Sequence, residues 1–136
     1  MAGHSATPLP KKLGLKQNLR IGFHNLPREV KTELKNEIAG CVLGQNGPLD
    51  YGHIFATSCA ELKKQFATFA RRLTPAGMLW VSWPKKSSGV ATDLDENQVR
   101  SIGLEAGLVD VKVCAVTDVW SGLKFVIRVK DRKEQE

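Results

Sequence analysis

The chain has 136 residues, of which 42% are hydrophobic and 25% are charged. This length and balance are typical of one globular domain with its own core. No apolar run approaches the ~18–20 residues of a membrane-spanning helix, and the first residues lack the apolar segment of a secretory signal. We therefore expect a cytoplasmic protein without a membrane partner. The net charge of +6 could help an anionic partner approach, but we favour the interpretation that it is a solvated basic surface.

The first 18 residues predict an arm with one short helix. Thr7 and Pro8 are typical of a helix start, and Gly14 is typical of a helix end. We divide the chain into this arm (1–18), a single Rossmann-like domain (19–130) and a charged tail (131–136) that we expect to be disordered.

A short apolar run at 19–23 predicts the first strand of the domain. Asn25 is a candidate cap for the next helix, and Pro27 fits the first turn of that helix. After this helix, residues 41–43 predict a brief second strand.

Two further strands frame the next helix. Residues 51–57 predict a buried strand, and Ser58 with Glu61 has the spacing of a capping box, which starts a helix. Pro75 and Gly77 should end that helix. The nearly continuous apolar residues that follow predict a strand covered on both faces.

The last part of the domain predicts one helix and a hairpin. Asp93 and Glu96 are candidate caps of the helix, and Gly107 fits its end. Two strands at 109–117 and 123–129 then flank a turn. Strands that alternate with helices predict an α/β fold, a three-layer Rossmann-like domain with a mostly parallel sheet. The final hairpin adds antiparallel pairing, and the N-terminal half is short.

Two segments carry a resemblance to a known fold. LDYGHIF at 49–55 resembles the fourth strand of class I S-adenosylmethionine-dependent methyltransferases, and LTPAGML at 73–79 resembles the entry to their fifth strand. The terminal hairpin resembles their sixth and seventh strands. The resemblance implies a reduced version of this Rossmann-like fold.

Other motifs resemble a family of small bacterial proteins that is defined only as a domain of unknown function. They are SATPL at 5–9, KKLG at 11–14, WPKK at 83–86 and WSGL at 120–123. This second resemblance implies no activity.

The sequence argues against S-adenosylmethionine as a cofactor. The methyltransferase fold normally has a glycine-rich turn after its first strand, where the backbone approaches the cofactor. Here Gly22 stands alone within the strand, and residues 41–46 lack the acid expected after the second strand. We therefore predict no cofactor. Because the histidines and cysteines are scattered, we predict no metal site either.

The loop after the central strand is the main candidate site. Lys85, Lys86, Ser87 and Ser88 offer hydrogen-bond donors at the carboxyl end of a strand, where open α/β sheets bind ligands. These residue types suit a phosphate or a carboxylate. The alternative is a solvated loop whose hydroxyl groups only cap the backbone.

Four more polar residues are candidates for ligand contacts at the same edge. Thr92 and Asp93 either cap the next helix or bind the ligand. His24 and Asn25 end the first strand and should face the same crevice. His24 is well placed for proton transfer, although a single histidine is more often structural.

Two tryptophans complete the set of candidate ligand contacts. Trp83 lies next to the loop and is expected on the same face of its strand as Trp80, which we assign to the core. Trp120 is expected in a turn, where an exposed indole would contact a ligand or a partner.

We therefore favour a non-catalytic binding or regulatory domain that holds a small anion or a protein segment over the loop at 85–93. The alternative is an enzyme, either a divergent methyltransferase or one that uses His24 and Asp93. A nucleic-acid accessory protein is a third, weaker interpretation, because the basic helix pairs at 63–64 and 71–72 lack aromatic neighbours.

Overall fold

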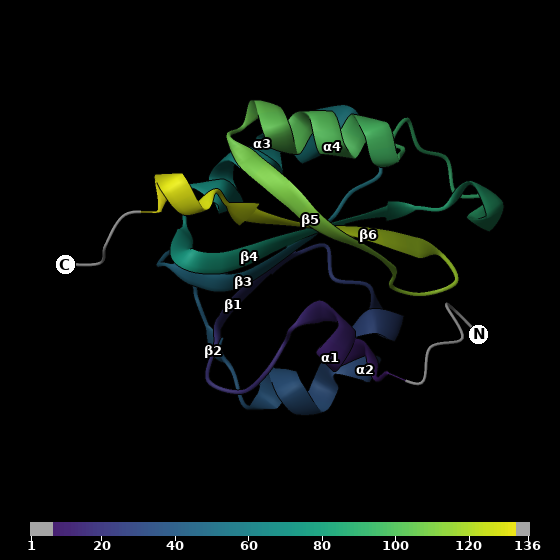
Figure 1. Cartoon of the computed structure of the whole chain (residues 1–136). Coiled ribbons are helices and arrows are strands. Elements are labelled where there is room, and N and C mark those ends of the chain that lie inside the picture. The colour runs from purple at the N-terminus through teal and green to yellow at the C-terminus, as the bar shows by residue number, and fades with distance from the viewer. Residues whose placement is uncertain (1–6, 133–136) are drawn as a thin grey trace.

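The computed structural model describes residues 7–132 as three layers around one sheet (Figure 1). The strands are β1 (Arg20–His24), β2 (Val42–Leu43), β3 (Leu49–Phe55), β4 (Leu73–Pro84), β5 (Leu108–Ala115) and β6 (Trp120–Ile127). The helices are α1 (Leu9–Leu13), α2 (Arg28–Ala39), α3 (Cys59–Ala70) and α4 (Glu96–Glu105), with 3-10 turns η2 (Lys86–Ser88) and η3 (Val129–Asp131). Figure 1 shows α1 and α2 on one face of the sheet and α3 and α4 on the other.

The sheet has the order β2-β1-β3-β4-β6-β5. β1 to β4 pair in parallel, whereas β6 is antiparallel to both β4 and β5. The predicted fold class is therefore confirmed, including the terminal hairpin. β2 and β3 lie on opposite sides of β1, so the chain changes direction across the sheet at β1. In open α/β sheets this switch point forms a crevice at the carboxyl ends of the strands, and ligands bind there.

The short N-terminal helix α1 is packed into the α2 layer. It ends at Gly14, whose φ of 75° is the left-handed conformation that favours glycine, as the sequence predicts. The Trp80 indole donates to the carbonyl of Leu13 at 2.8 Å. Lys12 Nζ donates to the carbonyl of Ala115 at 2.9 Å, and Lys112 Nζ donates back to that of Lys12 at 3.0 Å. The remaining parts of the predicted arm and tail, at 1–6 and 133–136, lie outside the described residues.

The predicted cap of one helix is confirmed, and the predicted caps of two other helices are wrong. The cap of α3 is confirmed, because Ser58 Oγ accepts from the amide of Glu61 at 3.2 Å. Asn25 does not cap α2, which begins directly after Pro27. Asp95, and not Asp93, caps α4 by accepting from the amide of Gln98 at 2.8 Å.

Two strand boundaries also differ from the prediction. β4 already begins at Leu73, so Pro75 and Gly77 lie within the strand. β6 already begins at Trp120, so this residue is not in a turn. The turn lies just before it, where Thr117 Oγ1 accepts from the amides of Val119 and Trp120.

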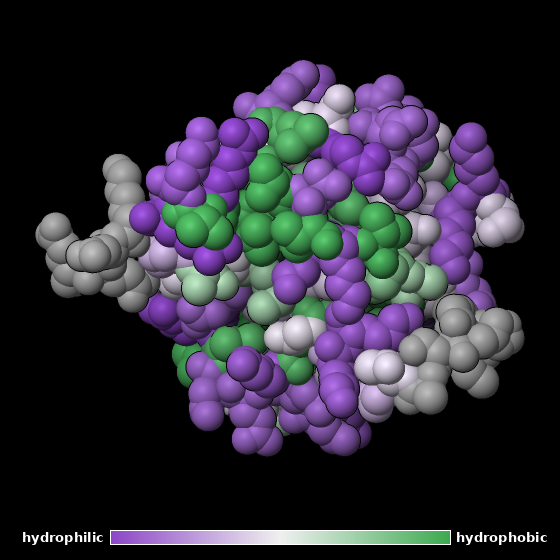
Figure 2. Space-filling model, viewed as in Figure 1, coloured by the Kyte–Doolittle hydropathy of each residue, from purple (hydrophilic) through white to green (hydrophobic). Residues whose placement is uncertain are grey.

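The surface over β5, the edge strand at the opposite end of the sheet from β2, is partly apolar. Val111 and Val113 are exposed on the edge strand β5, and Figure 2 shows apolar surface over this strand. Within residues 7–132, every helix is too short or too polar to cross a membrane.

We predict that Gly103→Ala destabilises the domain by about 1–3 kcal/mol, since it overpacks the core. A methyl group at position 103 of α4 would overlap the ring of Phe125 on β6. This cost exceeds the gain in helix propensity of about 1 kcal/mol. The measurement is urea unfolding, and Ser101→Ala on the exposed face of α4 is the control. Equal stability of Gly103→Ala and wild type would contradict this packing.

Candidate functional site

At the switch point of the sheet, a carboxylate joins the end of β1 to α3. Glu61 lies in the first turn of α3, and its Oε2 is 2.9 Å from both His24 Nε2 and Asn25 Nδ2 at the end of β1. Its Oε1 accepts from the amide of Thr57 at 3.1 Å. The structure therefore brings the predicted pair His24 and Asn25 together around a residue that the sequence identifies only as part of a helix cap.

This geometry assigns the proton on the imidazole of His24. Nε2 lies within hydrogen-bonding distance of a carboxylate oxygen, so it carries the hydrogen and donates to Glu61. Asn25 Nδ2 is also 3.1 Å from Nε2, because both groups donate to the same oxygen. Nδ1, the other ring nitrogen of His24, has no hydrogen-bond partner within residues 7–132. The arrangement is a histidine oriented by a carboxylate, as in general-base catalysis.

The charge of Glu61 is stabilised by its neighbours. Burial opposes its ionisation, but hydrogen bonds from His24, Thr57 and Asn25 outweigh burial and lower the pKa of the carboxyl group. Glu61 is therefore an anion at neutral pH, ready to accept a further hydrogen bond or to face a cation.

The turn after β1 is tight although it lacks glycines. Asn25 has φ of 55°, the left-handed conformation that a glycine normally supplies in such turns. Gly22, in contrast, serves packing inside the strand, since a side chain there would press against Leu49 at 3.1 Å. The sequence shows the missing glycines, but it does not show that Asn25 adopts their conformation.

In the predicted loop at 85–93, the hydroxyl group of Ser88 and the backbone amide of Lys85 already form hydrogen bonds with other groups of the protein. Ser88 Oγ donates to the carbonyl of Lys85 at 2.6 Å and accepts from the amide of Val90 at 3.1 Å. The amide of Lys85 donates to the carbonyl of Val119 at 2.7 Å. Lys86 and Ser87 are exposed. An anion site on this loop therefore stays a prediction that depends on its lysines.

The end of the same loop is attached to the start of α3. Thr92 Oγ1 donates to the carbonyl of Thr57 at 2.7 Å. Asp93 Oδ1 accepts from the amide of Cys59 at 2.8 Å. Both residues thus lie beside the switch crevice. Burial, reinforced by the nearby charge of Asp93, raises the pKa of the Cys59 thiol, so this cysteine is not an activated nucleophile.

Trp83 and Trp120 are packed more deeply than predicted. Trp83 belongs to the core under α3 and α4, whereas Trp80 belongs to the core under α1 and α2. The expectation of one shared face is wrong, because residues three apart along a strand point to opposite faces. Trp120 packs edge-on against Phe55, with 5.3 Å between ring centroids, and is partly buried.

A buried polar network beside the crevice was missed from the sequence. His53 on β3 is fully buried, with Nδ1 2.9 Å from the hydroxyl of Tyr51 and Nε2 2.7 Å from that of Ser82. Its ring stacks on Phe55, with centroids 4.2 Å apart. The signal was available, because positions 51, 53 and 55 alternate toward one face of a strand.

No family model and no curated protein matches the sequence. Solved structures do match. Magnesium protoporphyrin IX methyltransferase from Synechocystis PCC 6803 with bound SAH aligns with TM-score 0.57 at 12% identity, over 88% of this chain and 78% of that one. The precorrin-6y C5,15-methyltransferase from Geobacter metallireducens GS-15 gives 0.56 at 11% identity, over 88% and 85%.

A third match is a TehB-like SAM-dependent methyltransferase from Corynebacterium glutamicum, with TM-score 0.53 at 7% identity over 93% of this chain and 90% of that one. The chain therefore has the Rossmann-like fold of class I S-adenosylmethionine (SAM)-dependent methyltransferases. Its resemblance to the small bacterial family stays a prediction.

These matches correct two expectations. The three matched structures named above are methyltransferases, and the Synechocystis enzyme was solved with SAM as well as with SAH. The prediction of a non-catalytic binding domain and the prediction of no cofactor are therefore both wrong.

We predict that His53 makes the domain less stable in acid. Burial lowers the pKa of His53 to about 3, whereas an unfolded histidine titrates near 6.5. At a pH between these two pKa values, the imidazole of His53 binds a proton only in the unfolded state. The free energy of unfolding should therefore fall by up to about 1.4 kcal/mol per pH unit as the pH drops from about 6 to about 4. The measurement is urea unfolding across this range. His53→Gln should lose this component of the slope, and an unchanged slope would contradict the assignment.

Proposed function

We propose that the chain is a divergent SAM-dependent methyltransferase that binds SAM in the switch crevice between β1 and β3. The observation that carries this proposal is the convergence of His24, Asn25 and Glu61 at the carboxyl ends of these strands. The fold supports the same position, because open α/β sheets bind their ligands at the point where the strand order reverses.

The donor set of the crevice fits this cofactor. SAM carries an ammonium group, a sulfonium centre and ribose hydroxyls, and all of these favour a nearby carboxylate or another acceptor. Glu61 has about four acceptor positions, and three described donors use three of them. Because no acid follows β2, Glu61 takes the role of the acidic contact. The left-handed turn at Asn25 supplies the close backbone approach.

His24 is suited to remove a proton from the methyl acceptor. Bound SAM supplies an electrophilic methyl group, so the acceptor must present a lone pair. Nδ1 of His24 is free to take the proton of a hydroxyl or an amine, while Glu61 holds the ring and stabilises the imidazolium that forms. The substrates that best match this chemistry are protonated oxygen or nitrogen nucleophiles.

We expect SAM and SAH to bind the wild-type protein in calorimetry and to raise its melting temperature by mass action. Glu61→Gln should weaken SAM binding by about tenfold, since it removes a charge-assisted contact. Glu33→Gln on the exposed side of α2 is the matched control and should bind as wild type does.

His24→Asn separates binding from chemistry. It should keep SAM affinity within about threefold while it abolishes transfer to any hydroxyl or amine acceptor that the wild type methylates. Absence of SAM binding by the folded wild-type protein would contradict the proposed function itself.

A further inference from the structure

A second hollow lies at the opposite end of the sheet from the switch crevice. Its volume is about 600 Å³, and its walls come from α1, the segment that leads into β1, the last turn of α2, and β4. Lys16 and Gln17 precede β1, and Glu37 lies near the end of α2, the helix that runs back from the carboxyl edge. The cavity is therefore separate from the proposed SAM site, and its size is that of a small-molecule pocket.

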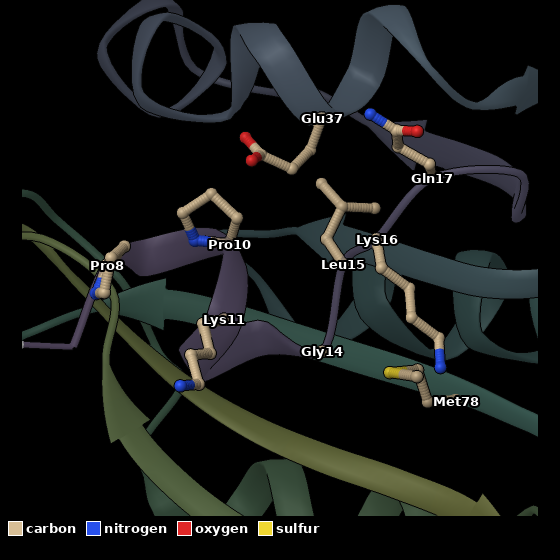
Figure 3. A pocket seen from close by; sticks show the side chains of 9 residues that line it. All are labelled: Pro8, Pro10, Lys11, Gly14, Leu15, Lys16, Gln17, Glu37 and Met78. Atoms are coloured by element: carbon tan, nitrogen blue, oxygen red, sulfur yellow. The ribbon is translucent and has the colours of Figure 1, made fainter.

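The floor and one wall of this cavity are apolar. Pro8, Pro10, Leu15 and Met78 contribute to the lining, and Figure 3 shows Pro10 and Leu15 between α2 and the sheet. Gly14 allows the close approach of α1 to β4, because a side chain there would lie 3.1 Å from Met78 Sδ. The hollow thus forms because the short helix α1, which begins directly after Pro8, packs against the amino-terminal half of β4.

Charges of opposite sign lie on opposite sides of this apolar surface. In Figure 3, Glu37 lies on the α2 side of Pro10 and Leu15, whereas the ammonium groups of Lys11 and Lys16 lie on the side of the sheet. Within residues 7–132, these three charged groups take part in no ion pair or side-chain hydrogen bond. The cavity therefore offers an unpaired anion, two unpaired cations and an apolar surface between them.

We propose that this cavity binds a small apolar zwitterion, that is, an amino acid or a short peptide with apolar side chains. The carboxylate of the ligand pairs with Lys11 or Lys16, its ammonium group pairs with Glu37, and its side chains cover Leu15 and Met78. A simple anion would lie near the like charge of Glu37, and a neutral apolar molecule would use none of the three charges.

Met78 makes this proposal directly measurable. The chain contains two methionines, Met1 and Met78, so methyl-labelled protein gives few methionine signals, and Met78→Leu assigns the one that reports on the cavity. The probes are leucine and leucyl-leucine, which differ in length, and three blocked forms of leucine that lack the ammonium charge, the carboxylate charge or both. A ligand with Kd of about 1 mM is about nine-tenths bound at about 10 mM, which sets the highest concentration.

We expect leucine or leucyl-leucine to shift the Met78 methyl signal, and the better of the two reports the length that the cavity holds. Blocking either charge should weaken binding by about tenfold, as expected for loss of a charge-assisted contact. Glu37→Gln should bind leucine and N-acetyl-leucine equally well. The double variant that combines Lys11→Gln with Lys16→Gln should bind leucine and leucine amide equally well. Glu33→Gln and Lys35→Gln, two exposed charges on α2, are the matched controls and should leave the preference unchanged.

The proposal is overturned if none of the probes shifts Met78 at the highest concentration. It is also overturned if the doubly blocked leucine binds as tightly as leucine itself, because the cavity would then recognise apolar surface alone. Failure of this test leaves SAM binding at the crevice unaffected, since neither Lys11, Lys16 nor Glu37 belongs to that site.

Discussion

The double pairing of β3 determines where the functional groups of this protein lie. β3 runs between β1 and β4, and its parallel register sets His24 at the end of β1 opposite Ile54 near the end of β3. Gly52 lets α3 close over the strand, because a side chain at that position would lie 2.9 Å from the ring of Phe69. With α3 held so close, its first turn brings Glu61 to the end of β1. The position of Glu61 beside the end of β1 thus depends on the pairing of β3 with β1 and on the glycine at position 52.

Glu61 serves the fold and the proposed chemistry at once. Its amide is capped by Ser58, while its carboxylate holds Thr57, His24 and Asn25. In methyltransferases with a glycine-rich turn, the backbone itself makes room for the cofactor. Here a side-chain carboxylate fixes the turn instead. The crevice is preorganised by hydrogen bonds between two elements that are 36 to 37 residues apart, so its geometry depends on the packed domain and not on a local motif.

Sequence patterns predicted most of the fold, because apolar periodicity and glycine positions are local signals. The place of His24 and Asn25 at the carboxyl edge of the sheet also followed, since they lie where a parallel strand ends. The role of Glu61 did not follow, because it requires the contact between α3 and β1.

The other errors have equally particular causes. Asp93 and Asp95 are both plausible caps, and only the path of the loop decides between them. Trp83 and Trp80 are three residues apart in β4, so they lie on opposite faces of the sheet and not on the predicted shared face. Leu13, in the segment that we predicted as an N-terminal arm with a short helix, is fully buried in the core.

The strand order has a consequence for synthesis of the protein on the ribosome. β6 is made after β5, yet it lies between β4 and β5. Until β6 emerges, β4 has an open edge and β5 has no partner, so a nascent chain exposes strand edges that favour pairing with other chains. The contact between Lys12 and Ala115 likewise joins residues 103 positions apart. β1 and β3 can pair early, whereas the sheet cannot be completed before β6 is made.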